Sequence, residues 1–252
     1  MNCVLKKTEI ESLKKSGQIL HQALLDATLA VKPGVSTKKL NDIAEKSVTA
    51  QLGICSFKNY YVEGMGKYPS ALCVSVNDEI VHGIPREDRI LEEGDIVSLD
   101  LGVIFEGMCT DAASTVAVGK IDPEIEKLLA ITEKSLQLGI EKARVGNKIG
   151  AIGAAIQNYA ESFGYGVVRD LVGHGVGPFP HTEPKIPNYG KPTEGPDIVE
   201  GMALAIEPMV TLGDYRIKAL PDGWTYSTRD GSKVAHFEHT IVIENGLPTI
   251  VT

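Results

Sequence analysis

The sequence predicts an α+β protein built from two similar halves, and two patterns support this. The first is an order of elements that occurs twice, namely helix, glycine, helix, glycine and then strands. The glycines that mark this order are Gly34 and Gly53, and then, 112 and 111 residues later, Gly146 and Gly164. The second is a central stretch of alternating residues that predicts an antiparallel hairpin. We therefore expect one domain, residues 1–252, with halves of about 1–120 and 121–252.

Two amphipathic helices are expected at the start of the first half. The first begins at Thr8, because Thr8 and Glu11 have the spacing of a capping box, and it stops at the Lys-Pro-Gly sequence 32–34. Its apolar stripe consists of Ile10, Leu13, Leu20 and Leu24. The second begins near Ser36 or Thr37 and stops at Gly53. A strand over 71–76 and the segment 81–85 follow.

The second half repeats this order. Asp122 and Pro123 are typical of an N-cap and a first helical turn, so a third helix begins there and ends at Val145-Gly146. A fourth helix ends at Gly164 and carries apolar side chains at helical spacing, which are Ile152, Ile156, Tyr159 and Phe163. Strand-like sequence follows, interrupted by a stretch rich in glycine and proline over 178–196.

The central stretch, residues 94–114, carries two carboxylates, Asp100 and Asp111. Its apolar row consists of Val97, Leu99, Leu101 and Val103, so Asp100 projects to the opposite face. Residues 105–107 interrupt the alternation and suggest a turn, and the returning strand is expected over 109–118. A turn centred between 105 and 106 sets the two aspartates directly opposite each other. One centred between 106 and 107 sets them one diagonal apart, and in both registers they share a face.

Two carboxylates at this range repel each other, and one becomes protonated unless a cation lies between them. The alternative is a pair of solvated aspartates on an outer sheet face. The neighbours Ser98, Gly102 and Ala113 are small and leave room for a bulky group, so we favour a metal pair.

The composition is ordinary for a globular protein, with 43% hydrophobic and 23% charged residues. A net charge of −8 and the lack of a basic patch argue against general nucleic-acid affinity. The four cysteines are scattered and predict reduced thiols. No segment resembles a signal peptide or a membrane span, so we expect a cytoplasmic protein without a membrane partner.

Further candidate metal ligands stand in unusual contexts. His174 lies between glycines in GHGVG, where the backbone can approach closely, so a ligand or catalytic role is favoured over core packing. Glu207 and Glu238 lie in apolar runs, where a carboxylate is rarely left unpaired. A buried salt bridge is the alternative, but the nearby cations Lys218 and Lys233 lie outside apolar runs. His82, His181 and His236 also have distinctive contexts, whereas His21 is expected to be structural.

The candidate metal set is Asp100, Asp111, His174, Glu207 and Glu238. Four negative charges exceed what one divalent ion neutralises, so we expect two ions per chain, with a separation of about 3.5–4 Å in sites of this type. Oxygen ligands with one imidazole accept Co, Mn, Fe, Zn or Ni, and metal availability decides among them.

With these motifs in order, the chain resembles the type I methionine aminopeptidases, which are pita-bread metallopeptidases, over nearly its whole length. The matching motifs are HGIP at His82, GDIVSLD at Asp100, TDAAS at Asp111, GHGVG at His174, AIEPM at Glu207 and FEHT at Glu238. The resemblance implies an α+β pita-bread fold, in which two pseudo-symmetric halves pack helices on a curved antiparallel β-sheet. It also implies that Asp100 chelates one metal, that His174 and Glu207 bind the other, and that Asp111 and Glu238 bridge both.

The implied activity is hydrolysis of the N-terminal Met-Xaa bond of nascent proteins when the second residue is small. Glu207 would take a proton from the attacking water, and a metal with His174 or His181 would stabilise the oxyanion. His82 and His181 would orient the substrate backbone. Tyr68, Cys73 and Trp224 are candidates for the methionine pocket, although Cys73 is equally consistent with core packing. The implied partner is the N-terminal peptide of a nascent chain, bound by a monomer with transient ribosome association.

The chain departs from the family pattern at two places. Pro180 stands where the family has Phe directly before the second histidine, and Phe179 is displaced by one position. His236 stands where Gln is frequent, and it either lies next to the metal ligands or merely shares the face of Glu238. The zinc-finger extension and the insertion of type II enzymes between His181 and Glu207 are missing, so we expect the short bacterial form.

Two alternatives remain. A proline-specific peptidase of the same fold would share all five ligands, but such enzymes normally carry an extra N-terminal domain, for which this chain has no room. A non-catalytic peptide-binding member would be expected to lose ligands, and none is lost here.

Overall fold

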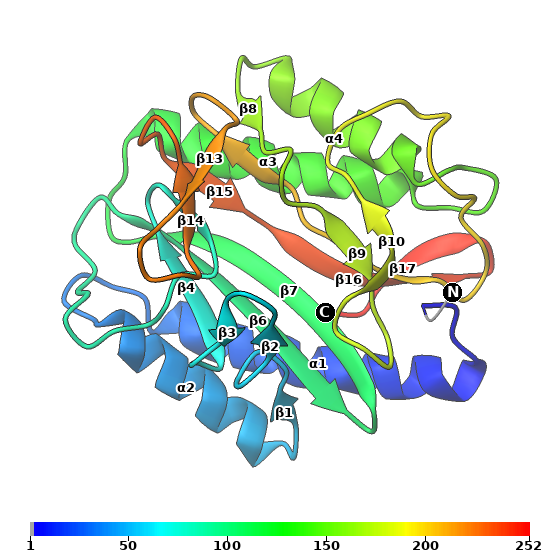
Figure 1. Ribbon diagram of the computed structural model, residues 1–252, viewed down its shortest axis with the longest axis horizontal. Coiled ribbons are helices and arrows are strands. Elements are labelled where there is room, and N and C mark those ends of the chain that lie inside the picture. The colour runs from blue at the N-terminus through cyan, green and yellow to red at the C-terminus, as the bar shows by residue number, and fades with distance from the viewer. Residues whose placement is uncertain (1–2) are drawn as a thin grey trace.

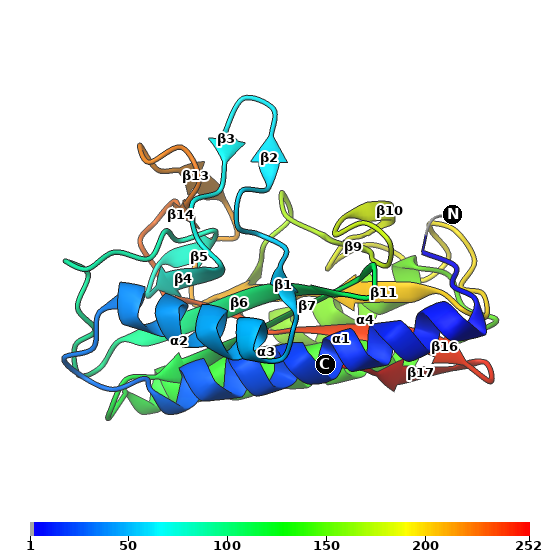
Figure 2. The ribbon, with the colours of Figure 1, turned by 90° about the horizontal axis from the view of Figure 1, so that it is seen from below.

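The computed structural model describes residues 3–252, in which four helices lie on one face of a nine-stranded antiparallel sheet (Figures 1 and 2). The helices are α1 (Lys7–Leu29), α2 (Thr37–Ala50), α3 (Pro123–Lys142) and α4 (Gly150–Glu161). The expected helix-helix-strand order therefore occurs in both halves, and the α+β prediction is confirmed. Within the described residues, no helix combines the length and the apolar character that a membrane span requires.

The large sheet runs through both halves of the chain. Its main path is β1 (Ile54–Cys55), β6 (Ile96–Phe105), β7 (Met108–Ala117), β16 (Glu238–Glu244), β11 (Ala203–Ile206), β9 (Gly173–Gly175) and β10 (Thr182–Ile186). Off this path, β4 (Leu72–Val76) pairs with β6, and β17 (Leu247–Ile250) pairs with β16. Because β7 pairs with β16, residues from both halves meet at the middle of a single sheet.

Three smaller sheets complete the fold, and the strands β2, β3, β13 and β14 lie on the side away from the helices (Figure 2). One contains β8 (Gly166–Val167), β12 (Met209–Thr211) and β15 (Val234–His236). Another contains β5 (Glu79–Val81), β13 (Ile217–Ala219) and β14 (Tyr226–Thr228). The last is a hairpin of β2 (Tyr61–Val62) and β3 (Gly66–Lys67).

The helix starts agree only partly with the expected caps. Thr8 and Glu11 do not form the capping box; α1 begins one residue earlier, and the backbone N–H of Lys6 donates to Glu9 Oε2 at 2.7 Å. Ser36 caps α2 as expected, because its hydroxyl accepts from the Lys39 N–H at 3.2 Å. Pro123 opens α3, but the side chain of Asp122 makes no capping bond.

The central hairpin is formed by β6 and β7, and it adopts the second of the two expected registers. Glu106 and Gly107 form a two-residue turn, with φ of 48° at Glu106 and 77° at Gly107. The positive φ at the second position is one that glycine adopts without strain. Gly102 therefore lies opposite Asp111, and Asp100 lies one diagonal away, opposite Ala113. Phe105, expected in the turn, instead ends β6.

The apolar row of β6 holds the helices against the sheet. Val97, Leu99, Leu101 and Val103 are fully buried in one cluster with side chains of α1 and α2. Burying each such side chain contributes up to about 1.5–3 kcal/mol relative to leaving it in water. The opposite row of the same strand is thereby directed away from the helices, so Asp100 faces the other side of the sheet.

The two halves join at a seam, which we define as Asp111, Ala113 and Thr115 on β7 with the residues opposite them, His236, Glu238 and Thr240. The Thr240 hydroxyl accepts from the Asp111 N–H at 2.8 Å and donates to the Asp111 carbonyl at 2.7 Å. At the other end, the Thr115 hydroxyl makes the same two bonds with the backbone of His236, each at 2.8 Å. Each threonine thus satisfies two backbone groups that the strand ladder leaves open.

Removing a seam hydroxyl should destabilise the protein more than removing a surface hydroxyl. Thr240→Val or Thr115→Val keeps the side-chain shape but leaves a buried N–H and C=O without partners, so we expect a loss of about 1–3 kcal/mol in the free energy of unfolding. Denaturant titration measures this loss. The control is Thr49→Val on the exposed face of α2, where the hydroxyl bonds only the Glu45 carbonyl. Equal effects at all three positions would show that the seam bonds contribute little.

Candidate metal centre

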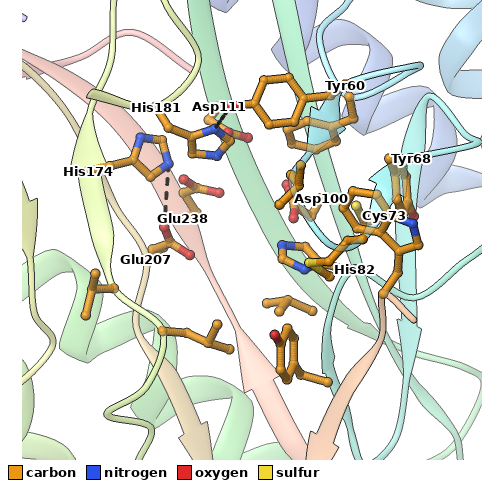
Figure 3. Close-up of a pocket in the computed structure, with 18 residues that line it drawn as sticks. Tyr60, Tyr68, Cys73, His82, Asp100, Asp111, His174, His181, Glu207 and Glu238 are labelled. Carbon is orange, nitrogen blue, oxygen red and sulfur yellow. Dashed lines mark hydrogen bonds and ion pairs between the residues drawn. The ribbon is translucent and has the colours of Figure 1, made fainter. Parts of the chain in front are cut away.

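A cavity of about 360 Å³ opens on the face of the sheet that the helices do not cover (Figure 3). Both halves contribute to its walls. The polar lining residues are Tyr60, Tyr68, His82, Asp100, Asp111, His174, His181, Glu207, Tyr226 and Glu238. The apolar ones are Phe57, Val62, Met65, Cys73, Val81, Leu171, Val172 and Trp224.

All five candidate metal ligands point into this cavity. Asp100, Asp111 and Glu238 project from the neighbouring strands β6, β7 and β16. His174 lies in the middle of β9, and Glu207 directly follows β11, which pairs with β9. The sheet therefore brings together residues that lie up to 138 positions apart in the sequence.

The glycines around His174 have the expected role. A Cβ on Gly173 would lie 2.4 Å from the Ala205 carbonyl oxygen, and one on Gly175 would lie 2.6 Å from that of Glu183. Since both oxygens belong to backbone of the flanking strands, only glycine permits this spacing. The short strand β9 is thus held tightly in the sheet, and His174 is directed into the cleft.

The ligand atoms group in a way that suits a shared site. One group, with potential ligand atoms within 4.8 Å of one another, contains Asp100, Asp111 and Glu238. A second contains His174, Glu207 and Glu238, so Glu238 belongs to both. A third joins His181 to Asp111 and His174, so His181 also stands within reach of this centre.

Burial strongly disfavours the charged forms of these groups. Loss of hydration raises the pKa of Asp100 to about 7 and that of Glu207 to about 8, and it raises those of Asp111 and Glu238 well above their usual range. Loss of hydration also lowers the pKa of His174 to about 3. In this environment the carboxylates need a positive partner to remain ionised.

Unpaired oxygens indicate where that partner would bind. Asp100 Oδ1, Asp111 Oδ1 and Glu238 Oε1 are buried, and none has a hydrogen-bond partner among the described residues. Buried polar atoms are normally satisfied, and carboxylate oxygens are ligands for hard divalent ions. The residues present therefore fit a divalent metal centre.

Two further histidines face the same cavity. His82 follows β5 with a φ of 59°, and its buried Nδ1 has no partner among the described residues. Burial lowers the pKa of His82 to about 4, so this imidazole is neutral at physiological pH. His181 precedes β10, and its ring centre lies 4.4 Å from that of His174. Both rings are placed to hydrogen-bond a molecule in the cleft.

His236 not only shares the face of Glu238 but also lies beside the candidate ligand Glu207. It is 1% exposed, and its Nε2 lies 3.6 Å from Glu207 Oε2. His236, His239 and His21 are not among the residues that line the cavity. His239 faces the helix side and bonds Thr252 Oγ1 at 3.0 Å, and His21 lies on α1.

The expected side-chain pocket lies beside the acidic groups. Tyr68 and Trp224 are buried and pack edge to face, with ring centroids 5.2 Å apart. The Tyr68 hydroxyl donates to the Gly83 carbonyl at 2.8 Å, which anchors this wall. Cys73 lies opposite Asp100 in the ladder between β4 and β6; it lines the same cavity and also belongs to a buried cluster with Tyr68 and Trp224.

Sequence reasoning missed the contribution of the hairpin that contains β2 and β3. Tyr60, Val62 and Met65 line the cavity from this segment, whose sequence has no recognisable motif. Phe179, in contrast, is 56% exposed and does not line the cavity. The aromatic contact beside His181 comes from Tyr60 in the other half of the chain.

Comparisons with known proteins agree with this geometry. The family described as metallopeptidase family M24 matches residues 11–245. A protein of Clostridium acetobutylicum named methionine aminopeptidase is 46% identical over 252 residues, covering 100% of this chain and 99% of its own length. A crystal structure of methionine aminopeptidase from Thermotoga maritima has a TM-score of 0.96 at 40% identity and covers 100% of this chain and 99% of that chain.

A more distant structure shares the fold alone. Prolidase from Pyrococcus furiosus has a TM-score of 0.74 at 20% identity, and the match covers 100% of this chain and 65% of that chain. The expected pita-bread architecture, with helices on one face of an antiparallel sheet, is therefore confirmed.

The raised carboxyl pKa values predict how pH affects the protein after its metal is removed by chelation. A carboxyl group whose pKa is higher in the folded chain binds more protons there, so its contribution to stability is lost as pH rises through the folded pKa. The histidines have lowered pKa values, so they make the folded protein more stable as pH rises, but this effect ends at their unfolded pKa of about 6.5. Stability of the metal-free protein should therefore fall between about pH 6.5 and pH 8, the range in which Asp100 and Glu207 titrate.

Thermal melting across this range measures the trend, and the matched control is the same series with a saturating divalent ion, in which the fall should shrink. A metal-free protein that becomes more stable over this range would contradict the electrostatic description of the site.

Proposed function

The chain belongs to metallopeptidase family M24, and from this premise we propose that it is a methionine aminopeptidase, a metal-dependent hydrolase that removes the N-terminal methionine of nascent polypeptides. One observation carries the proposal. Acidic groups with buried, unpaired oxygens converge beside an apolar pocket within a single cavity. This arrangement can hold divalent ions and a peptide N-terminus with an apolar first side chain at the same time.

We assign the five candidate ligands to two ions. Asp100 would hold one ion, His174 and Glu207 would hold the other, and Asp111 and Glu238 would be shared by both. The grouping of ligand atoms supports this division, because Glu238 belongs both to the group of Asp100 and to the group of His174 and Glu207. The ligand chemistry accepts Co, Mn, Fe, Zn or Ni.

When bound, the ions lower the pKa of a water molecule and polarise the carbonyl of the first peptide bond. The protein supplies the proton transfers. The Glu207 carboxylate takes a proton from the attacking water and returns it to the leaving amine. Burial alone raises the pKa of Glu207 to about 8, and a bound cation would lower it again and keep the carboxylate ionised, ready to accept that proton.

His82 and His181 bind the peptide backbone at the reacting bond. Their imidazoles are neutral because burial lowers both pKa values, so each ring presents one N–H donor. A donor aimed at the carbonyl oxygen stabilises the negative charge that develops there during attack. His236 Nε2 lies 3.6 Å from Glu207 Oε2, which is beyond hydrogen-bond range, so this buried ring borders the glutamate carboxylate without bonding it.

The first side chain of the substrate enters the pocket formed by Tyr68, Cys73 and Trp224. These buried walls belong to one apolar cluster with Phe57, against which Val62 and Met65 also pack. An unbranched thioether fills such a pocket well because it is flexible and polarisable. A second residue with a large side chain would meet the protein near His82 and His181, so small second residues are preferred.

The expected setting is a cytoplasmic monomer that meets its substrate at the ribosome. A net charge of −8 and four unpaired cysteines in the described residues support a reducing compartment without general nucleic-acid binding. The duplication of the two halves, at about 1–120 and 121–252, belongs to the same proposal.

Two divalent ions should bind per chain, and the bridging carboxylates should affect both. Asp111→Asn or Glu238→Gln should weaken binding at both sites by about tenfold or more, because each substitution removes a charge that both ions share. Calorimetric titration of the metal-free protein measures stoichiometry and affinity. The matched control is Asp88→Asn, whose side chain is 82% exposed and lies outside the cavity. Two unchanged sites in either cavity variant would refute the bridging assignment.

The reconstituted enzyme should cleave Met-Ala-Ser and Met-Gly-Ser rapidly and Met-Lys-Ser poorly. Norleucine should replace methionine well, whereas Ala-Ala-Ser should be slow, because an apolar pocket distinguishes missing methylenes by about 1–3 kcal/mol. The measurement is kcat/KM for each tripeptide with each candidate metal.

Three outcomes would contradict the proposal. Equal rates for Met-Ala-Ser and Met-Lys-Ser would remove the size limit on the second residue. Leu-Ala-Ser equal to Met-Ala-Ser would remove the methionine preference, and cleavage confined to X-Pro bonds would favour a proline-specific peptidase.

A further inference from the structure

The hairpin of β2 and β3 rises on the side of the sheet away from the helices (Figure 2), and Val62 on this hairpin lines the cavity. The residue immediately before this hairpin, Tyr60, reaches His181 in the other half of the chain, 121 positions away (Figure 3). This contact crosses the mouth of the cavity, whereas the seam joins the same halves at its floor.

The contact combines a hydrogen bond with ring packing. The Tyr60 hydroxyl oxygen lies 3.2 Å from His181 Nδ1, and the ring centroids are 5.4 Å apart with an angle of 52° between the ring planes. His181 also packs against His174, with ring centroids 4.4 Å apart. Two aromatic neighbours and one hydrogen bond therefore restrict how the His181 ring can rotate.

The hairpin base holds Tyr60 in position for this contact. The Tyr60 carbonyl accepts from the Tyr68 N–H at 2.9 Å, and the Tyr60 N–H donates to the Phe57 carbonyl at 2.9 Å. Both partners line the apolar part of the cavity. The tyrosine that contacts His181 is thus fixed to the wall that would receive the first side chain of the substrate.

The chemistry of the two groups sets the direction of the hydrogen bond. A phenol, with a pKa of about 10, is a much stronger acid than the N–H of neutral imidazole, and the unprotonated imidazole nitrogen is a much stronger base than the phenol oxygen. Tyr60 therefore donates to Nδ1. Because neutral imidazole carries a single proton, the proton of His181 must reside on Nε2.

We propose that Tyr60 is a positioning residue that acts through His181, because its hydroxyl keeps the ring in the Nε2–H tautomer and directs that N–H into the cleft. The inference rests on the proposed function, in which His181 donates to the substrate backbone. It adds a residue from the opposite half of the chain that prepares this donor before substrate binds, so that no reorganisation is needed during attack.

The test compares Tyr60→Phe with Tyr61→Phe. The first variant loses only the hydroxyl that contacts His181. The second is a matched control, because Tyr61 is the next residue of the same hairpin and is 64% exposed. For Tyr60→Phe we expect kcat on Met-Ala-Ser to fall by about tenfold with KM changed by less than about twofold, because the interaction acts on the transition state. Tyr61→Phe should retain the kcat of the parent protein.

A second readout does not depend on turnover. Long-range proton–nitrogen correlation spectra of histidine-labelled, zinc-loaded protein report which ring nitrogen carries the proton, and His181→Ala identifies the signals of His181. The parent protein and Tyr61→Phe should show His181 with the proton on Nε2. Tyr60→Phe should show a mixture that includes the Nδ1–H tautomer.

The outcomes separate this inference from the proposed function. A parent protein that fails to cleave Met-Ala-Ser overturns the function, while the spectra still decide the tautomer. An active parent with unchanged kcat in Tyr60→Phe overturns the positioning role. A His181 Nε2 that bears no proton in the parent, or a Tyr60→Phe spectrum identical to that of the parent, overturns the tautomer assignment.

Discussion

The burial of four carboxylates in one cleft is the constraint on which the rest of the structure depends. Asp100, Asp111, Glu207 and Glu238 lose most of their hydration, and three of them keep an oxygen without a partner in the described residues. Such a cluster disfavours the folded state unless positive charge compensates it. The protein therefore needs a rigid frame that keeps mutually repelling groups at a spacing suitable for ions.

The frame is the antiparallel sheet together with the helices behind it. The same strands that present acidic groups on one face bury aliphatic rows on the other, where α1 and α2 pack against β6. Because alternate residues of a strand point to opposite faces, stability and chemistry are assigned to different sides of one element. Apolar packing on the helix side can thus offset the free-energy cost of burying the carboxylates on the other side, because the two faces use different residues.

The sequence anticipated the features that depend on local geometry. Alternation along 96–104 placed Asp100 and the aliphatic row on opposite faces, and the glycines beside His174 indicated a close backbone approach. The hairpin register stayed open between two choices until the positive φ of Glu106 and Gly107 located the turn. Pattern reasoning therefore reached the candidate ligands.

Contacts between distant segments could not be predicted from sequence patterns. The proximity of His236 to Glu207 and the contact between Tyr60 and His181 both depend on how loops from the two halves are folded over the sheet. No periodicity in either segment encodes such pairings. The error at Thr8 and Glu11 has a local cause, because Lys6 and Glu9, which decide the helix start, have the same three-residue spacing as the expected pair.

The threonine bonds of the seam have a mechanical consequence. Direct pairing between β7 and β16 extends over two residue pairs, and threonine hydroxyls make the connections at either end. The halves are also joined away from the seam, where β5 pairs with β14 and Tyr60 contacts His181. Connections at these separate places brace the halves against rotation about the seam, so the spacing of Asp111 and Glu238 does not depend on the short ladder alone.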